Sequence, residues 1–553
     1  MGGGIVFELG GLIRALLRRK AGGPVANLKS VTVWAQDLPE NDLQEAQEAI
    51  VAAMVSINGN RSTPLIDRIQ VLMYLDEKAA GLQDSLYRDY LAHGTEPNAP
   101  ESLYPPTITS FWEALAAGYH RCIREFAQNA AGRRVRQKLP FLTARAMRCY
   151  AMQAKWCHMR YLPVESRVWR RLHRLYLLAE RQGFARTPLR LYPHANRETT
   201  CAAEYLQPLL LSLANPDSLL PAEIEMADLW LDSWSQYLTL ETEFRPQRQL
   251  YAVNLADGKP GKRLRRNMLG EKYRYWSVHP LLERVASITE SLKNGELPAR
   301  LGLGEDCRLP GCLDLIELVT ARWTGQGGAR RHERRERADS VQVTLGLRAV
   351  LEQLQPGRKP GAPRPVPPPD EHPAMDYRLD DILAPVPSPG EGAAADPEEL
   401  FEDALPPWTM ENESVSGYAV AFDQGGGRSP GIGTLIGLRP DRKTLAVGVV
   451  RRMNRDLSGR VQLGIETLAL SPIAVKLHPP PSTRGNAPLD ALYLPGLPDC
   501  QVARSLLIPS KAYARERVME LKAQGKSYTI RFQQVPEQTE DYARVQFEVL
   551  AKH

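Results

Sequence analysis

The feature that most constrains this 553-residue chain is a change of apolar periodicity at one short basic run, residues 330–337, RRHERRER. Before the run, apolar residues recur at helical spacing over long stretches. Directly after it, residues 340–347 alternate as SVQVTLGL, the pattern of a β-strand with one buried face. The sequence therefore predicts a multidomain α + β protein, in which an α-helical N-terminal domain is followed by β-structure.

The N-terminal domain is expected to span residues 1–325. Apolar stripes at helical spacing predict successive helices, and a strand entering an Asp-Gly turn at residues 249–259 predicts one small hairpin among them. The expected helical segments are residues 65–92, 109–128, 142–160, 164–181, 199–214, 221–240 and 281–323.

The helical domain has one unusual stretch of charge. Residues 145–190 contain eleven Lys or Arg residues and two acidic residues. One interpretation is a basic helical face, spanning residues 133–190, that binds nucleic acid, an acidic protein or anionic lipid. The other interpretation, which we favour, is a set of solvated side chains that lie over the core, because no nucleic-acid-reading motif accompanies the charge.

A Pro-rich segment interrupts the β-structure. Residues 355–407 contain fourteen of the 44 prolines, and we expect them to form a largely disordered insertion. An island within it, residues 375–383, is either a docking peptide or a chance apolar cluster. The β-strands that follow are expected from residue 418 onward. Residues 473–553 form a β-rich C-terminal extension, which either continues the first sheet or makes a second barrel.

Composition narrows the compartment and the class of protein. Seven cysteines, odd in number and mostly isolated, predict a reducing compartment and no disulfide scaffold. No stretch reaches the ~18 apolar residues of a membrane-spanning helix, so we expect a cytoplasmic protein. The net charge of +6 favours anionic partners. No Ser-His-Asp, Cys-His or metal-ligand pattern is evident, so we expect a non-enzyme without metal or cofactor.

Two motifs point to a family. Arg331 and Arg335 read R-x-x-x-R, with Arg330 and Arg334 as an overlapping register, and residues 412–417 read N-x-S-x-x-G. A hairpin at residues 446–466 follows, with a V-x-R strand and then Gly-Ile-Glu. With these motifs in this order, the chain resembles the PilZ domain, a small β-barrel receptor for the bacterial second messenger cyclic di-GMP. The resemblance covers residues 328–470. It implies a barrel made of residues 326–354 and 408–472, from which the insertion loops out.

The resemblance also implies a ligand site. One arginine of the R-x-x-x-R motif would pair with phosphate and guanine acceptors, and another would stack on a purine. Asn412 and Ser414 would hydrogen-bond a guanine edge, and Gly417 would let the backbone approach. The two arginine registers stay open. Ordinary turn chemistry is the alternative role for Asn412, Ser414 and Gly417.

These observations predict a non-enzymatic bacterial signalling effector that binds cyclic di-GMP at a PilZ-like barrel. It would relay binding to a helical domain that contacts a protein partner, in motility, adhesion or biofilm control. The partner would bind the helical domain or the 375–383 island. The alternative is a nucleic-acid-binding or scaffold protein that acts through the basic helical face, with a degenerate barrel.

Overall fold

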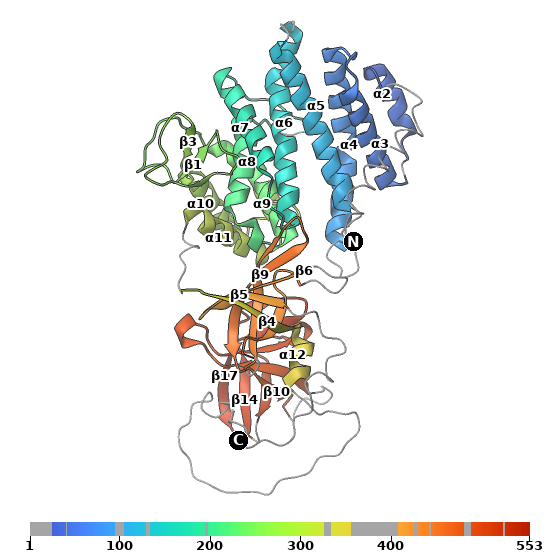
Figure 1. The fold of residues 1–553 in the computed structure, drawn as a ribbon. Coiled ribbons are helices and arrows are strands. Elements are labelled where there is room, and N and C mark those ends of the chain that lie inside the picture. The colour runs from blue at the N-terminus through green and yellow to red at the C-terminus, as the bar shows by residue number, and fades with distance from the viewer. Residues whose placement is uncertain are drawn as a thin grey trace. The chain divides into compact units, whose positions relative to one another are not determined.

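The computed structural model describes residues 25–39, 41–93, 104–128, 133–193, 197–325, 333–354, 408–423, 430–441, 444–480, 488–523 and 526–553. The chain divides into two compact units, residues 1–329 and 330–553, and each is described by itself (Figure 1). Arg330, Arg331 and the whole Pro-rich insertion, with its 375–383 island, lie outside the described residues.

The first unit is α-helical, as predicted. One apolar core runs through it from Val31 to Trp323. Its helices are α2 (Leu28–Trp34), α3 (Leu43–Gly59), α4 (Leu65–His93), α5 (Tyr104–Gln128), α6 (Arg133–Met159), α7 (Ser166–Arg181), α8 (Cys201–Leu213), α9 (Pro221–Trp234), α10 (His279–Lys293) and α11 (Gly311–Thr324). The expected helical segments up to residue 240 are confirmed, although α9 ends at Trp234, earlier than expected, because a 3-10 turn over Ser235–Tyr237 follows it. The single segment expected over residues 281–323 is wrong, since α10 ends at Lys293 and α11 begins only at Gly311.

Local sequence explains where individual helices begin. Helix α8 begins at Cys201 because the Thr200 hydroxyl accepts the backbone N–H of Ala203 at 3.1 Å, which satisfies one free donor of the first turn. Helix α7 buries Trp169, Leu172 and Tyr176 on one face and turns its arginines to the other. The amphipathic pattern of the sequence therefore sets which side of α7 packs.

The predicted hairpin is a three-stranded sheet, in the order β2 (Lys262–Arg263), β1 (Tyr251–Asn254), β3 (Tyr273–Trp276). One feature differs from expectation. Cys307 and Cys312 form a disulfide, although the sequence predicted no cysteine pairing. The loop before α11 brings their Cα atoms to 5.3 Å, a spacing that the separation along the chain alone does not reveal.

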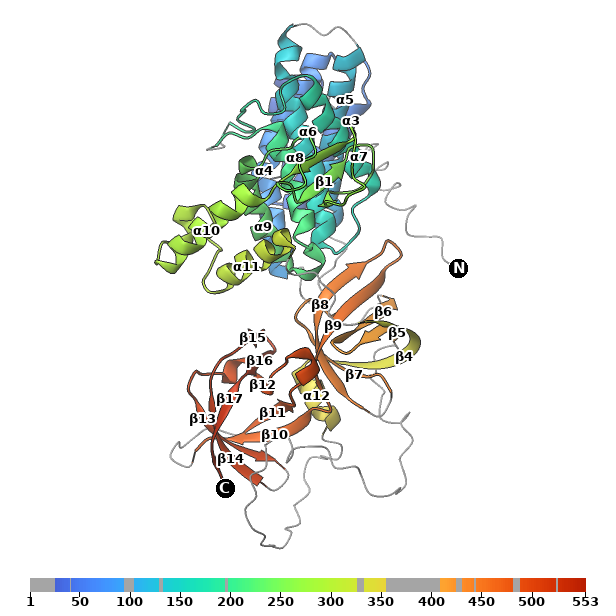
Figure 2. The same cartoon turned by 90° about the vertical axis from the view of Figure 1, so that its left-hand side faces the viewer.

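The second unit begins with a closed antiparallel barrel in the order β4-β5-β6-β9-β8-β7 (Figure 2). Its strands are β4 (Arg335–Leu345), β5 (Trp408–Ser414), β6 (Gly417–Asp423), β7 (Leu435–Arg439), β8 (Ala446–Arg455) and β9 (Arg460–Leu470). The predicted barrel and the β-rich C-terminal region are thus both present, and the expected fold class is confirmed.

Three local predictions need correction. The first strand was expected over residues 340–347, but β4 begins at Arg335, because β5 pairs with it as far as that residue. At Gly346 the backbone turns with φ +84°, and helix α12 (Leu347–Leu354), which was not predicted, begins there. Strand β5 was also not expected. Within it, Trp408 and Met410 are buried at alternate positions, the spacing of a half-buried strand.

The remaining strands form a second sheet with its own apolar core. The order is β15 (Glu537–Gln538), β16 (Tyr542–Val545), β12 (Ser505–Pro509), β11 (Leu489–Leu494), β10 (Ile473–His478), β13 (Val518–Ala523), β14 (Lys526–Phe532), β17 (Phe547–Lys552). Only Gln546 separates β16 from β17 along the chain, so the two sides of this sheet meet at one bent stretch and the sheet curls into a barrel-like shape. Residues 473–553 thus form a sheet of their own and do not continue the first barrel.

Helix α12 joins the two sheets. Leu347, Val350 and Leu351 pack against Leu435 of the first barrel and Leu492 of the second sheet in one buried cluster.

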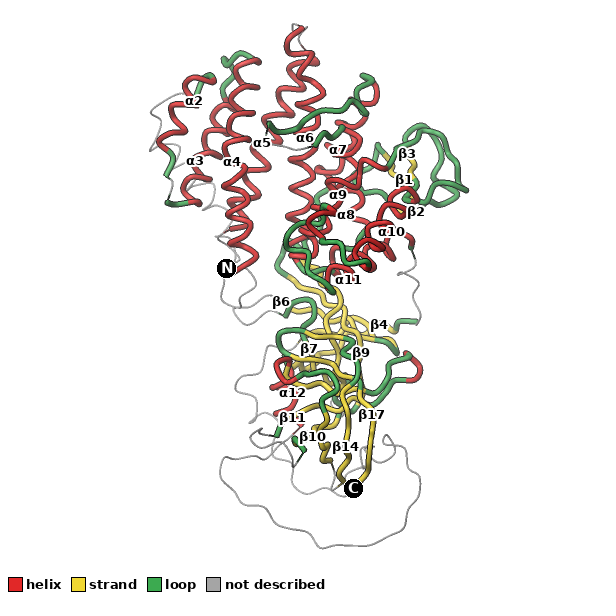
Figure 3. The backbone as a smooth tube through the Cα atoms, turned by 180° about the vertical axis from the view of Figure 1, so that it is seen from behind, coloured by secondary structure: helices red, strands yellow, loops and turns green. Residues whose placement is uncertain are grey.

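The two units differ in secondary structure, since the first consists mostly of helices and the second mostly of strands (Figure 3). In the part of the chain that the structure describes, no helix combines the length and apolar character needed to cross a membrane.

Candidate functional site

The N-x-S-x-x-G motif forms the β5–β6 hairpin. Asn412 and Ser414 end β5, a two-residue loop follows, and Gly417 opens β6 as the pairing partner of Ser414. The Ser414 hydroxyl donates to the Gly417 carbonyl at 3.2 Å. Ser414 therefore has the turn role that the sequence left open as an alternative, and the hairpin holds the three motif residues together.

Gly417 is required by the close approach of β9. A Cβ atom at this position would lie 2.1 Å from the backbone oxygen of Ile465, a distance that no side chain tolerates. Glycine thus lets β6 and β9 pair tightly at the end of the hairpin. The resemblance implied that Gly417 lets the backbone approach a ligand, and that role stays a prediction, since the close approach in the structure is to β9.

Strand β4 places the basic run beside this hairpin. In the antiparallel register Arg335 pairs with Glu413 and Glu336 pairs with Asn412. Residues directly opposite share a face of the sheet, so Glu336 lies on the Asn412 face and Arg335 on the Glu413 face. Arg334 directly precedes β4, and the same alternation, if continued by one residue, would put it on the face of Asn412 and Ser414.

The two faces differ in environment. Glu413 pairs across the strands with Tyr418, which is half-buried. Burial raises the pKa of Tyr418 above its usual range, and the negative charge of Glu413 adds to that shift. On the other face, Asn412 lies opposite Ala419, on the outer surface of the barrel. The outer face is therefore the one open to a ligand.

The arginines of the run are not equivalent. Arg337 is held by Asp339 and by Glu413, with Nη1 3.0 Å from the Glu413 Oε1 atom. Arg334 and Arg335 are exposed, and among the described residues neither has an ion-pair partner. Two guanidinium groups are thus available for an anionic ligand, and their geometry suits phosphate.

Sequence reasoning did not assign the residues of β9 that complete the outer face. Gly464 pairs with Ala419, and Glu466 pairs with Gly417. Both belong to the Gly-Ile-Glu segment, which contributed to the family resemblance without receiving a role. The signal that identifies them is the strand register, which is not visible in the sequence.

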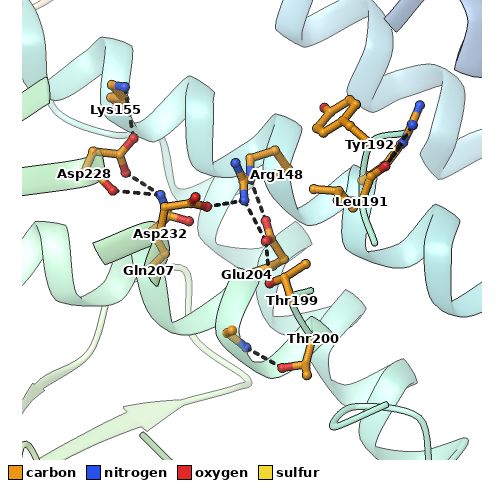
Figure 4. A network of polar contacts seen from close by, with 12 residues as sticks. Arg148, Lys155, Leu191, Tyr192, Thr199, Thr200, Glu204, Gln207, Asp228 and Asp232 are labelled. Carbon is orange, nitrogen blue, oxygen red and sulfur yellow. Dashed lines mark hydrogen bonds and ion pairs between the residues drawn. The ribbon is translucent and has the colours of Figure 1, made fainter. Parts of the chain in front are cut away.

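Residues 133–190 do not form a single basic surface, because three basic side chains of α6 are paired with carboxylates of other helices and are not solvated as expected. Arg148 of α6 is held by Glu204, with distances of 2.6 and 2.7 Å, and by Asp232 (Figure 4). Lys155, 5% exposed, is held by Asp228 at 2.9 Å and by Glu225.

Arg145, which is fully buried, completes the pattern on α6. Its Nη1 lies 3.1 Å from Asp76, and its Nη2 lies 2.6 Å from Glu77. These α6 side chains face the interior because neighbouring helices supply carboxylates.

Helix α7 carries most of the exposed charge of the basic stretch, and Arg186 and Arg190 beyond its end are exposed as well. Arg167, Arg170, Arg174 and Arg181 are exposed and recur at helical spacing along one side. Arg167 is paired with Glu113 and Glu165. Among the described residues, no three His, Cys, Asp or Glu side chains lie close enough together to hold a metal ion.

Two family models match this chain. The model of the N-terminal domain of the cyclic-di-GMP receptor FimW matches residues 29–247, and the model of the FimW C-terminal β-barrel domain matches residues 473–550. This chain is similar to FimW at both of these stretches. The cyclic-di-GMP receptor FimW of Pseudomonas aeruginosa is 24% identical to it over 488 residues, which are 80% of this chain and 77% of FimW. No solved structure matches.

The two FimW stretches correspond to parts of the described fold. The first covers α2 to α9 of the helical unit, and the second covers the sheet that begins at β10. The FimW description of the second stretch as a β-barrel agrees with the curled sheet seen here. The two stretches flank the closed barrel that carries the N-x-S-x-x-G hairpin.

Proposed function

We propose that this protein is a non-enzymatic signalling effector that binds cyclic di-GMP on the outer face of its closed barrel. The observation that carries the proposal is the β4–β5 register, which pairs Arg335 with Glu413 and Glu336 with Asn412 and so puts the exposed end of the basic run next to the N-x-S-x-x-G hairpin. The relationship to FimW at both ends of the chain supports the same ligand. The PilZ-like receptor domain would comprise residues 326–354 and 408–472, with 355–407 as an insertion and 473–553 as the C-terminal extension.

The chemistry of the ligand fits the residues on that face. Cyclic di-GMP carries two phosphodiester anions and two guanine rings. Arg334, on the Asn412 face, would pair with a phosphate, and the Asn412 amide and Ser414 hydroxyl would bond a guanine edge. Because Arg335 shares the Glu413 face, we favour the register of Arg330 and Arg334 over that of Arg331 and Arg335. No metal or cofactor enters this scheme.

Titration calorimetry of the full chain with cyclic di-GMP tests the proposal, with linear pGpG and GTP as control ligands. We expect specific binding that Arg334→Ala weakens by at least tenfold, since a charge-assisted contact contributes about 1.5–3 kcal/mol. Arg335→Ala is the matched control and should weaken binding less. Absence of binding to folded wild-type protein would refute the function, and a larger effect of Arg335→Ala would reverse the register.

The helical domain, residues 1–325, would be the output of the receptor. Ligand contact with the residues that join the domains, 326–334, would change the relative disposition of the domains and thereby the contact with a protein partner. Such a relay requires a ligand that binds two conformations with different affinity. Small-angle scattering of the full chain with and without saturating ligand measures it, and identical curves would contradict the relay.

A second candidate function rests on α7. Arg170, Arg174 and Arg181 are exposed and have no ion-pair partner among the described residues, so an acidic protein or a nucleic acid is a possible counterpart. Binding of mixed oligonucleotides that falls steeply with salt and is lost in an Arg170→Ala/Arg174→Ala variant would favour this candidate, provided that cyclic di-GMP does not bind.

A further inference from the structure

The outer face beside the N-x-S-x-x-G hairpin has a floor of small residues. Strands β6 and β9 pair so that Gly417 lies opposite Glu466 and Ala419 opposite Gly464. Gly417, Ala419 and Gly464 are thus neighbours, and each is half-buried. A Cβ atom added to Gly464 would meet Arg452 Cβ at 3.2 Å and, among the described residues, no other atom within 4 Å. The floor above Gly464 is therefore open.

Polar residues border this floor on two sides. Asn412 and Ser414 lie on β5, and Glu466 lies on β9, two strands away. Adjacent strands are ~4.8 Å apart, so the two borders are separated by about 10 Å. That width accommodates one planar purine base lying on the small residues, with a polar group at each of its edges.

The Glu466 carboxylate, at the border of the floor on β9, is held in place by one arginine. Arg451 Nε donates to Glu466 Oε2 at 2.7 Å, and the Glu466 side chain remains 45% exposed. Arg451 is itself clamped by Glu537 of β15, with both guanidinium nitrogens donating at 2.6 and 2.8 Å. The Tyr542 hydroxyl donates to Glu537 Oε1 at 3.0 Å. The second sheet thus orients a carboxylate that belongs to the first barrel.

A carboxylate is acceptor-only, so it distinguishes bases by the donors they present. Guanine presents N1–H and the exocyclic 2-amino group on one edge, and both donate to a carboxylate at once. Adenine has an acceptor at N1 and no 2-amino group. We propose that Glu466 selects guanine on this floor, and that Arg451 and Glu537 are positioning residues for it. This inference rests on the proposed function.

The cation and the carboxylate that the proposal uses lie at opposite borders of the face, which also carries Glu336 opposite Asn412. Arg334 borders β5 on the side opposite Glu466, because the strand order is β4-β5-β6-β9. Three strand spacings, about 14 Å, separate the arginine that would receive phosphate from the carboxylate that would receive the base. The anionic part of the ligand and Glu466 are thereby kept apart.

Calorimetric titration of the full chain with cyclic di-GMP, cyclic di-IMP and cyclic di-AMP tests the inference. Cyclic di-IMP lacks only the 2-amino groups of cyclic di-GMP. We expect wild-type protein to prefer cyclic di-GMP to cyclic di-IMP about tenfold, the effect of one hydrogen bond to a charged group. Glu466→Gln should bring the two ligands to within about threefold of each other. Glu537→Gln removes the carboxylate that holds Arg451. It should reduce the preference for cyclic di-GMP over cyclic di-IMP by a smaller factor than Glu466→Gln does.

Glu548→Gln is the matched control, because Glu548 is a partly exposed carboxylate on β17 that is also paired with an arginine, Arg531. It should leave the preference unchanged. An unaltered preference in Glu466→Gln overturns the inference while the proposed function stands, and so does an equal loss of affinity for all three ligands. If wild-type protein binds none of the three, the proposed function fails and the inference fails with it.

Discussion

Two groups of arginines in this chain have opposite environments. Arg145 and Arg148 of α6 lie among carboxylates inside the helical unit, and Arg145 is fully buried. Arg334 and Arg335 at the start of β4 are exposed, and the described residues offer them no ion pair. The comparison teaches that a count of basic residues in a sequence does not show which charges are available to a partner.

The difference has a physical cause. A charge inside a helical core is tolerated only when carboxylates surround it, because the loss of hydration costs several kcal/mol. Asp76 of α4, Glu204 of α8 and Asp232 of α9 supply that compensation for α6. At β4 the side chains remain in water, so no compensation is required and the charge stays free for a ligand.

The largest effect is expected for Arg145→Met. The change leaves the buried carboxylate of Asp76 without its cation and should destabilise the helical unit by ~3–5 kcal/mol. Urea unfolding followed by tryptophan fluorescence measures this, because eight of the nine tryptophans lie before residue 330. An Asp76→Leu/Arg145→Met double variant should recover part of the loss. A single variant within 1 kcal/mol of wild type would show that the pair contributes little.

A change of pH should also affect the helical unit. Burial lowers the pKa of His173 to about 4, and its ring contacts Tyr205 and the Lys259 carbonyl. A histidine whose pKa is lower in the folded state contributes stability that is complete above pH ~6.5 and is lost as the pH falls toward 4. The loss is ~3 kcal/mol for a shift of this size.

Urea midpoints measured between pH 7.5 and 4.5 check this expectation. In His173→Asn the dependence on pH should be shallower than in wild type. His279→Asn is the control substitution, because the His279 side chain is exposed. Identical profiles for wild type and His173→Asn would contradict the assignment.

For Arg334, at the start of β4, we expect a small effect on stability and a large effect on ligand binding. Arg334→Ala should change the free energy of unfolding by less than ~0.5 kcal/mol, since the side chain is exposed and has no ion pair among the described residues. The same variant should lose most of the thermal stabilisation that saturating cyclic di-GMP provides to wild type. A destabilised variant in the absence of ligand would mean that Arg334 has a structural role.

The smallest effect is expected on α12. Arg348 and Glu352 form an exposed pair at 2.9 Å, with side chains 92% and 64% exposed. Arg348→Ala should therefore cost less than ~0.5 kcal/mol, which chemical denaturation can bound. A loss comparable with that of Arg145→Met would remove the distinction between buried and exposed arginines on which the comparison depends.

Much of the fold could be predicted because helical periodicity is a local property. The stripe on α7 and the turn signal at Asp257 were sufficient to locate their elements. Strand β5 was not predicted, since it directly follows a Pro-rich segment and its residues Asn412–Ser414 resemble a turn. Helix α12, eight residues long, gave too short a pattern, and its place depends on packing between two sheets.

The candidate site was predictable only in its motifs. The sequence by itself determined the basic run, the N-x-S-x-x-G hairpin and the change from helical to strand periodicity, because each depends on residues close together in the chain. Tertiary structure decided that Arg335 lies opposite Glu413 and Glu336 opposite Asn412, since that depends on the register between β4 and a strand more than seventy residues later. It also decided which charges are neutralised, because the carboxylates around α6 come from helices distant in sequence.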